Sequence, residues 1–301
     1  MELTGAHGGC CVIAHKKERW MKDPSQPGER IRVSELSQPK PTILKIGGSV
    51  ITDKNNELAA RTQVINRLAE EILKANVKDL VIVHGGGSFG HPTAQKYGIK
   101  DGLKDDKQVL GFAETHHVMT VLNGLFMDAL VWHNIPAVSI TPSSCIITEM
   151  GRIKFFDDAI LKTLLKMEFL PVLYGDAIID QKLGFTILSG DQIVSYVAGK
   201  FNAERIIMGV DVDGLYNADP KIAENTKMYS HLTLEELKKL KEKLGKPTAC
   251  DVTGGMFAKM AELVPAIEHG IPVTIVNGTK PDYIYKALVG EKVEGTTIKK
   301  E

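Results

Sequence analysis

Residues Leu80–His91 read LVIVHGGGSFGH. A short run of apolar, mostly β-branched residues passes directly into the glycines Gly85–Gly87, and a histidine follows four residues later. Such a run is typical of a buried strand, and glycines at its end let the backbone turn tightly and come close to a ligand. Residues Thr42–Ser49, TILKIGGS, have the same plan. Both stretches therefore predict buried strands that end in ligand-binding loops.

Short runs of this kind recur along the chain, and helical patterns lie between most of them. We expect strands at Thr42–Ile46, Leu80–Val83, Ala137–Ile140, Pro171–Leu173, Arg205–Val210 and Pro272–Val276. We expect helices around Val64–Leu73 and at Val109–Trp132, Asp157–Lys166, Gln192–Phe201, Leu234–Leu244 and Met256–His269. This alternation predicts an α/β fold, with an open, mostly parallel sheet between two layers of helices. In such sheets ligands bind beyond the carboxyl ends of the strands.

The composition narrows the class of partner. The chain has 301 residues, with 37 Lys and Arg against 37 Asp and Glu, so its formal net charge is +0. A neutral chain lacks the general positive charge that attracts nucleic acid or an anionic membrane, and no apolar run is long enough to span a bilayer. The cysteines, Cys10, Cys11, Cys145 and Cys250, form no CxxC pair. We therefore expect no disulfide framework or structural metal, and a cytoplasmic protein.

The first forty residues differ from the rest. They contain Pro24, Pro27 and Pro39, scattered charges and no sustained apolar period. We expect residues 1–40 to be a flexible extension and residues 41–301 to form a single domain.

Three glycine clusters stand at the predicted strand ends, and each has a cation near it. Gly47–Gly48 has Lys45 and Lys54, Gly85–Gly87 has His91, and Gly254–Gly255 has Lys259. Close backbone N–H groups, helix N-termini and cations together suit phosphate oxygens. The Walker pattern GxxxxGK[ST] does not occur. A GxGxxG pattern does occur at Gly85–Gly90, but no acidic residue ends the next strand, so a dinucleotide site is not favoured.

Four of these segments together resemble the amino acid kinase superfamily: Lys45–Ser49, Gly85–Gly87, Asp211–Gly214 and Gly254–Lys259. Within it, GGGSFGH, Lys54 after Thr52-Asp53, and DVTGGMFAK at Asp251–Lys259 are similar to the isopentenyl phosphate kinases. The resemblance covers Thr42 to the C-terminus. It implies an αβα sandwich, a homodimer, an acceptor-binding N-terminal half and an ATP-binding C-terminal half. The implied reaction moves a phosphoryl group from ATP, accompanied by Mg²⁺, to isopentenyl phosphate in isoprenoid biosynthesis.

The resemblance also implies a set of site residues. ATP would contact Lys45, Gly47, Gly48, Ser49, Gly87, Asp211, Asp213, Tyr216, Gly255 and Lys259. The acceptor would contact Gly86, His91 and Gly190, and the catalytic residues would be Lys45, Lys54, His91 and Asp176. A phosphate monoester is largely a dianion at neutral pH, so the reaction needs cations rather than a general base. We therefore expect Asp176, taken as the end of a strand, to hold Lys45 and Lys259 in place. We see no dedicated protein cage for Mg²⁺.

Other readings stay open at this point. The apolar helix Gly111–Trp132 would wall the isoprenoid pocket by resemblance, although core or dimer packing explains any single residue as well. His84 is expected to be a packed strand residue, and the adjacent His116 and His117 cannot readily share a metal ion. The acceptor of such a fold could instead be glutamate, acetylglutamate, UMP or a phosphonate. A nucleotide-binding protein without turnover is the remaining alternative.

Overall fold

The structure, a computed structural model, describes residues 39–217, 226–244 and 252–301. Its centre is an eight-stranded sheet with the order β12-β14-β13-β9-β1-β2-β6-β3. The strands are β1 (Thr42–Ile46), β2 (Leu80–His84), β3 (Ala137–Ser139), β6 (Leu170–Tyr174), β9 (Arg205–Val210), β12 (His231–Thr233), β13 (Val273–Asn277) and β14 (Gly295–Lys299). The neighbours from β13 to β3 are all parallel, whereas β14 is antiparallel to β13. The predicted α/β class with a mostly parallel sheet is confirmed.

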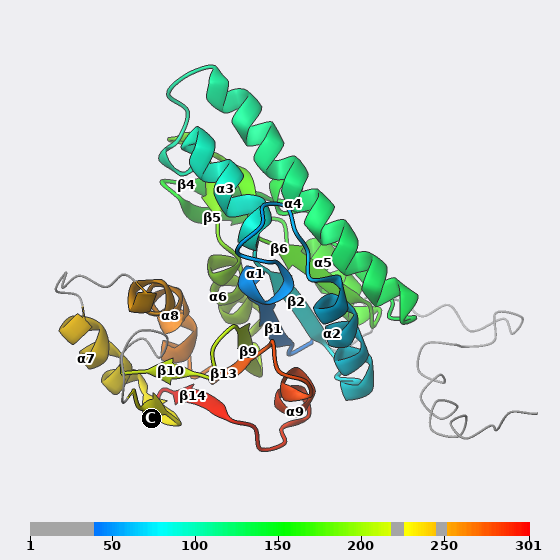
Figure 1. The fold of residues 1–301 in the computed structure, drawn as a ribbon, viewed down its shortest axis with the longest axis vertical. Coiled ribbons are helices and arrows are strands. Elements are labelled where there is room, and N and C mark those ends of the chain that lie inside the picture. Colours follow the sequence, from blue (N-terminus) through cyan, green and yellow to red (C-terminus); the bar gives the residue numbers. More distant parts are fainter. Residues whose placement is uncertain (1–38, 218–225, 245–251) are drawn as a thin grey trace, which may run out of the picture.

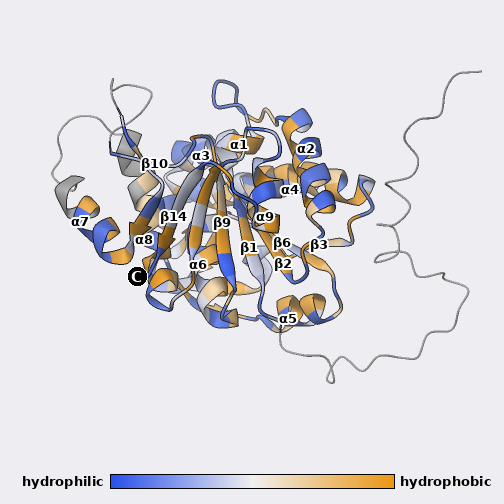
Figure 2. Cartoon of the chain, turned by 90° about the horizontal axis from the view of Figure 1, so that it is seen from below, coloured by the Kyte–Doolittle hydropathy of each residue, from blue (hydrophilic) through white to orange (hydrophobic). Residues whose placement is uncertain are grey.

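Helices cover both faces of this sheet, as Figure 2 shows. One face carries α5 (Ala159–Lys166), α6 (Gly190–Phe201), α7 (Leu234–Leu244) and α8 (Val252–Glu268). The other carries α1 (Gly48–Ile51), α2 (Thr62–Ala75), α3 (Gly87–Tyr97), α4 (Lys107–Trp132) and α9 (Tyr283–Val289). The expected helices are all present, although α8 begins at Val252 rather than at Met256. The expectation of a flexible extension falls almost entirely outside the described residues.

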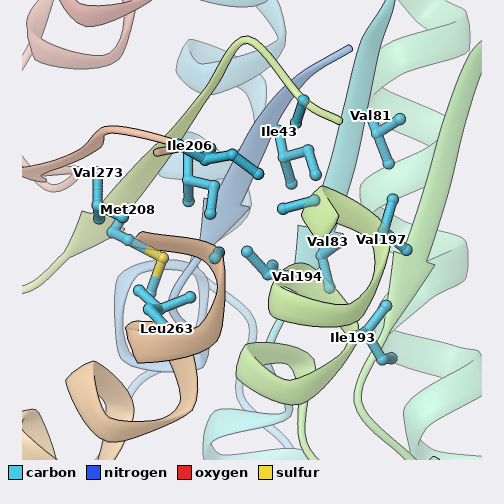
Figure 3. Packing of buried hydrophobic residues seen from close by; sticks show 14 of the residues in the cluster. Ile43, Val81, Val83, Ile193, Val194, Val197, Ile206, Met208, Leu263 and Val273 are labelled. Atoms are coloured by element: carbon cyan, nitrogen blue, oxygen red, sulfur yellow. The ribbon is translucent and has the colours of Figure 1, made fainter. Parts of the chain in front are cut away.

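The strands are apolar on both sides because each side faces a helix layer. Ile43 of β1 and Val83 of β2 pack with Val194 of α6 and Leu263 of α8, a cluster that Figure 3 shows from close by. Leu44, next to Ile43, belongs to the separate core under α2 and α4. Successive side chains of a strand alternate between its faces. Lys45, two residues after Ile43, therefore points toward α6 and α8.

A second, smaller sheet stands beside α3 and α4, where Figure 1 shows β4 and β5. Its order is β5-β4-β7-β8, from β4 (Ile146–Glu149), β5 (Arg152–Phe156), β7 (Asp176–Asp180) and β8 (Gly184–Leu188). These strands were not expected from the sequence. The expectation that Asp176 ends a strand is wrong, because β6 ends at Tyr174 and Asp176 is the first residue of β7. The hairpin β7–β8 carries the chain from the large sheet to α6.

The remaining elements in the described part of the chain are short. They are two 3₁₀ turns, Ile99–Asp101 and Pro142–Ser144, and the strand pair β10 (Leu215–Tyr216) and β11 (Met228–Tyr229). Within the described ranges, no helix is both long and apolar enough to cross a bilayer.

Candidate active site

A cavity of about 700 Å³ lies where the loops after β1, β2, β6, β8 and β9 meet. The chain leaves β1 toward β2 on one side, whereas β9 lies on the other side, so this is the point of the sheet at which ligands are expected. Most of the predicted site residues line it: Lys45, Gly48, Ser49, Lys54, Gly86, Gly87, His91, Asp176, Gly190, Asp211 and Lys259. The structure thus gathers residues from both halves of the chain around one space.

Three predicted ATP residues are not among those that line the cavity in the described part of the chain. Gly47 donates its backbone N–H to the carbonyl of Gly209 at 2.8 Å. Asp213 is bound by Lys280 at 2.5 Å and by Asn277 at 2.9 Å, and Tyr216 lies in β10. Gly255 is in α8, but its surroundings lie outside the described part of the structure.

The loops after β1 and β2 pack backbone against backbone. A Cβ atom on Gly48 would overlap the main chain of Gly87, and one on Gly87 would overlap Gly48 and the hydroxyl of Thr52. Thr52 donates from its hydroxyl to the carbonyl of Gly48 at 2.8 Å and accepts from the N–H of Ser88 at 3.0 Å. Thr52 thereby ties the two loops together. No role for Thr52 could be predicted from the sequence, because its hydrogen-bond partners are known only from the fold.

The buried cation of the site is Lys45, whose side chain is 4% exposed. Its Nζ lies 2.9 Å from a carboxylate oxygen of Asp191, in the first turn of α6. The expectation that Asp176 holds Lys45 is therefore wrong. The strand directs Lys45 toward α6, and Asp191 is the carboxylate that this helix presents there. Ser189 caps the same helix by accepting from the N–H of Gln192 at 3.2 Å.

A second lysine crosses the mouth of the cavity. Lys54 Nζ lies 2.7 Å from Asp211, which follows β9, and the hydroxyl of Ser49 donates to the other oxygen of Asp211 at 3.0 Å. The side chain of Lys54 is 56% exposed, so this pair is in contact with water. The loops after β1 and β9 are thus joined through one carboxylate.

Lys259 and His91 lie near Lys45, so that the site combines two positive lysines with a histidine. Loss of hydration lowers the pKa of His91, and the charges of Lys259 and Lys45 lower it further. Burial likewise lowers the pKa of Lys259, and the charge of Lys45 adds to the effect. His91 is therefore neutral at pH 7 and can donate one N–H. An anion bound between these groups would relieve their mutual repulsion.

The cavity is also lined by apolar side chains. They include Ala94 of α3, Met119 of α4, and Ile187 and Leu188 of β8. Most of the apolar residues of α4 lie elsewhere. Leu122 and Phe126 are in the core beneath the helix, and Phe112 packs on Phe185. Met119 is thus the member of the predicted helical wall that reaches this space.

Asp176 also lines the cavity, with its carboxylate bound to His116 of α4 rather than to a lysine. The Nδ1 atom of His116 is 3.1 and 3.0 Å from the two carboxylate oxygens. Burial raises the pKa of Asp176 to about 6, while His116 and the N–H of Ala177 oppose the rise. From the sequence, His116 was considered only as a possible metal ligand. Within the described residues no group of three or more His, Cys, Asp and Glu side chains could hold a metal ion.

A parallel sheet with glycine loops and converging cations defines a protein that binds phosphate groups. Residues 40–277 match the model of the amino acid kinase family, and the chain belongs to this family. It is 39% identical over 264 residues to the isopentenyl phosphate kinase of Methanothermobacter thermautotrophicus and 38% identical over 271 residues to that of Methanocaldococcus jannaschii. Each match covers 85% of this chain and 98% of the relative.

A solved structure shows the same likeness. It is described as "X-ray structures of isopentenyl phosphate kinase", and it matches with a TM-score of 0.76 and 36% identity. The match covers 85% of this chain and 99% of that one. The family indicated by the loop motifs is therefore confirmed, and within it the chain groups with the isopentenyl phosphate kinases.

The close approach of the two glycine loops can be tested by stability. Gly87 has φ +49 and no room for a Cβ, whereas Gly151 has φ +75 and nothing within 4 Å of that position. Gly151→Ala should cost about 1 kcal/mol, the penalty of the left-handed backbone alone. Gly87→Ala should cost roughly 1–3 kcal/mol more because it also overpacks the loops. Urea unfolding of both variants measures the difference, and equal losses would contradict the packing described.

Proposed function

We propose that this protein transfers the γ-phosphoryl group of ATP to isopentenyl phosphate, forming isopentenyl diphosphate and ADP. The relatives that share most of its length carry the name of this activity. The observation that carries the proposal is the mixed lining of the cavity, in which Lys45, His91 and Lys259 occur together with the apolar side chains of Met119 and Ile187. A phosphate monoester with a hydrocarbon tail needs both environments.

The chemistry requires charge neutralisation. An oxygen of the acceptor phosphate forms a bond to the γ-phosphorus, and the bond from that phosphorus to the β,γ-bridging oxygen breaks, so that ADP leaves with the electron pair. The acceptor is already an anion, so no base has to remove a proton. The barrier comes from bringing two polyanions together, and fixed cations and N–H donors lower it.

The proposed roles follow from position. Lys45 and Lys259 would hold the donor phosphates, Lys54 would stabilise the transferring group, and His91 would donate to the acceptor phosphate. The backbone of Gly86 and Gly190 would serve the acceptor. ATP would use Gly47, Gly48, Ser49, Gly87, Asp211, Asp213, Tyr216 and Gly255 in addition. Asp191 takes the positioning role first assigned to Asp176, because a buried lysine without its carboxylate would lose its fixed place.

The proposal includes three further points. Residues 41–301 form one domain with an acceptor-binding N-terminal half and an ATP-binding C-terminal half. The positions of His91 in the first half and of Lys259 in the second support this division. Mg²⁺ accompanies ATP, bound through phosphates and water. The protein is a cytoplasmic homodimer that binds no nucleic acid, supported by the zero net charge and by exposed apolar residues such as Trp132, which is 82% exposed.

The substrate is tested by measuring ATP consumption with isopentenyl phosphate, glutamate, acetylglutamate and UMP. We expect turnover with isopentenyl phosphate alone, because the apolar side chains that line the cavity suit its hydrocarbon tail. Turnover with glutamate instead would overturn the acceptor while leaving the kinase class intact. No turnover with any of the four would favour a binding protein without activity.

Replacing His91 with Ala should weaken use of the acceptor. It removes a hydrogen bond to a charged group, worth roughly 1.5–3 kcal/mol, so kcat/KM for isopentenyl phosphate should fall about 10- to 100-fold. His117→Ala is the control, because His117 is exposed on α4 away from the cavity. Steady-state kinetics with saturating ATP decide the matter, and unchanged constants would remove His91 from the acceptor site.

Replacing Lys259 with Ala should slow turnover while the acceptor still binds. The lysine acts on the donor phosphates, so kcat should drop about 10- to 100-fold. Lys96→Ala, on the exposed face of α3, is the control. Calorimetric titration with isopentenyl phosphate alone provides the second readout. Loss of that binding would show that donor and acceptor sites are not divided as proposed.

A further inference from the structure

A buried charge lies in the wall of the cavity, among apolar lining residues. The carboxylate of Asp176 has 0% exposed side-chain surface, yet the residue lines the cavity beside Thr115, Met119 and Ile187. It accepts from His116 Nδ1 and, at 2.8 Å, from the N–H of Ala177. The presence of an ionised group among side chains that suit a hydrocarbon tail requires a physical explanation.

The reaction chemistry does not supply that reason. Lys45 is held by Asp191, and no base is needed. Stability does not supply it either, since a buried ion pair is often no better than an apolar pair of the same size. The cost of the buried carboxylate is visible in its pKa, which burial raises to about 6.

The orientation of the pair is asymmetric. His116 does not line the cavity, and its side chain is 34% exposed, whereas Asp176 borders the cavity and its side chain is 0% exposed. The negative member of the pair therefore lies buried in the cavity wall, next to the ligand space but not in contact with it. Charges out of contact with solvent are screened much less than exposed ones, so this carboxylate acts on anything bound beside it.

We propose that Asp176, held in place by His116, makes the enzyme reject acceptors whose tail carries a second negative charge. The inference rests on the proposed function and adds selectivity to it. A neutral hydrocarbon tail meets only apolar contacts, whereas a carboxylate in the tail meets a like charge across a water-poor wall.

Matched acceptors isolate this charge. In 3-(phosphonooxy)propanoate a planar carboxylate replaces the isopropenyl group of isopentenyl phosphate atom for atom, and 3-(phosphonooxy)propanamide is its neutral counterpart. All three carry the same phosphate on the same two-carbon linker. The ratio of kcat/KM for the amide to that for the carboxylate therefore reports the charge of the tail and cancels the shared phosphate contacts.

The ratio is measured at pH 8 for the wild-type protein and for variants of the pair. We expect the wild type to prefer the amide roughly 10- to 100-fold, as repulsion between two nearby charges in a protein environment predicts. Asp176→Asn should reduce this preference about tenfold or more. His116→Leu should act in the same direction, because a carboxyl group without its donor takes up a proton, whereas His116→Gln retains a donor and should keep the preference. His117→Leu is the control.

The outcomes separate the two proposals. If the wild-type protein does not phosphorylate isopentenyl phosphate, the proposed function fails and this inference fails with it. If it does, but the amide-to-carboxylate ratio is near one or does not change in Asp176→Asn, only the inference fails. A merely structural pair would lower activity with all three acceptors alike and leave the ratio unmoved. Should Asp176→Asn not fold, the two His116 variants decide, since equal ratios in both would overturn the inference.

Discussion

The buried contact between Lys45 and Asp191 is the interaction on which the site depends. It joins the central strand of the sheet to the first turn of α6, and it fixes a cation where the strand order reverses. Strand geometry leaves little choice, because Ile43 faces the α6–α8 core and Lys45 must face the same way. A lysine placed there without a carboxylate would be an unpaired buried charge. The packing of Ile43 in the core therefore sets the direction of the Lys45 side chain, and Asp191 of α6 holds its ammonium group in place.

The glycine loops also help to form the site, through their backbone rather than through charged side chains. Gly48 and Gly87 approach so closely that neither tolerates a side chain, and Thr52 bonds to both loops. This approach brings N–H groups from two strands to the same space. Backbone donors add no negative charge and have no flexible side chain to order, so they complement the lysines at low entropic cost. The site is thus built from a rigid backbone floor with cations around it.

The sequence predicted the parts of this arrangement that are local. Residues Thr42–Ile46 and Arg205–Val210 are strands with the expected bounds, and two of the three glycine clusters follow strands as their pattern indicated. The prediction is wrong for Gly254 and Gly255, which lie in α8 and, within the described ranges, follow no strand. The small sheet was missed because its strands are short, polar at several positions and paired in hairpins. Asp191 and His116 were missed for a different reason. Their partners are 146 and 60 residues away, so no spacing or periodicity connects them, and only the fold brings them together.

The cavity wall combines cations with a buried carboxylate, and a kinase that acts on a phosphate ester needs more than a site for phosphate. Cations that attract one polyanion attract any other, so Lys45 and Lys259 cannot by themselves distinguish one phosphate ester from another. Shape discriminates weakly among small tails, since a methylene group in an apolar pocket changes binding by only about 1–3 kcal/mol. A fixed carboxylate in the cavity wall acts on the net charge of the tail, which shape cannot sense. Buried in that wall and bonded to His116, Asp176 adds this discrimination without weakening the positive field in which the phosphates react.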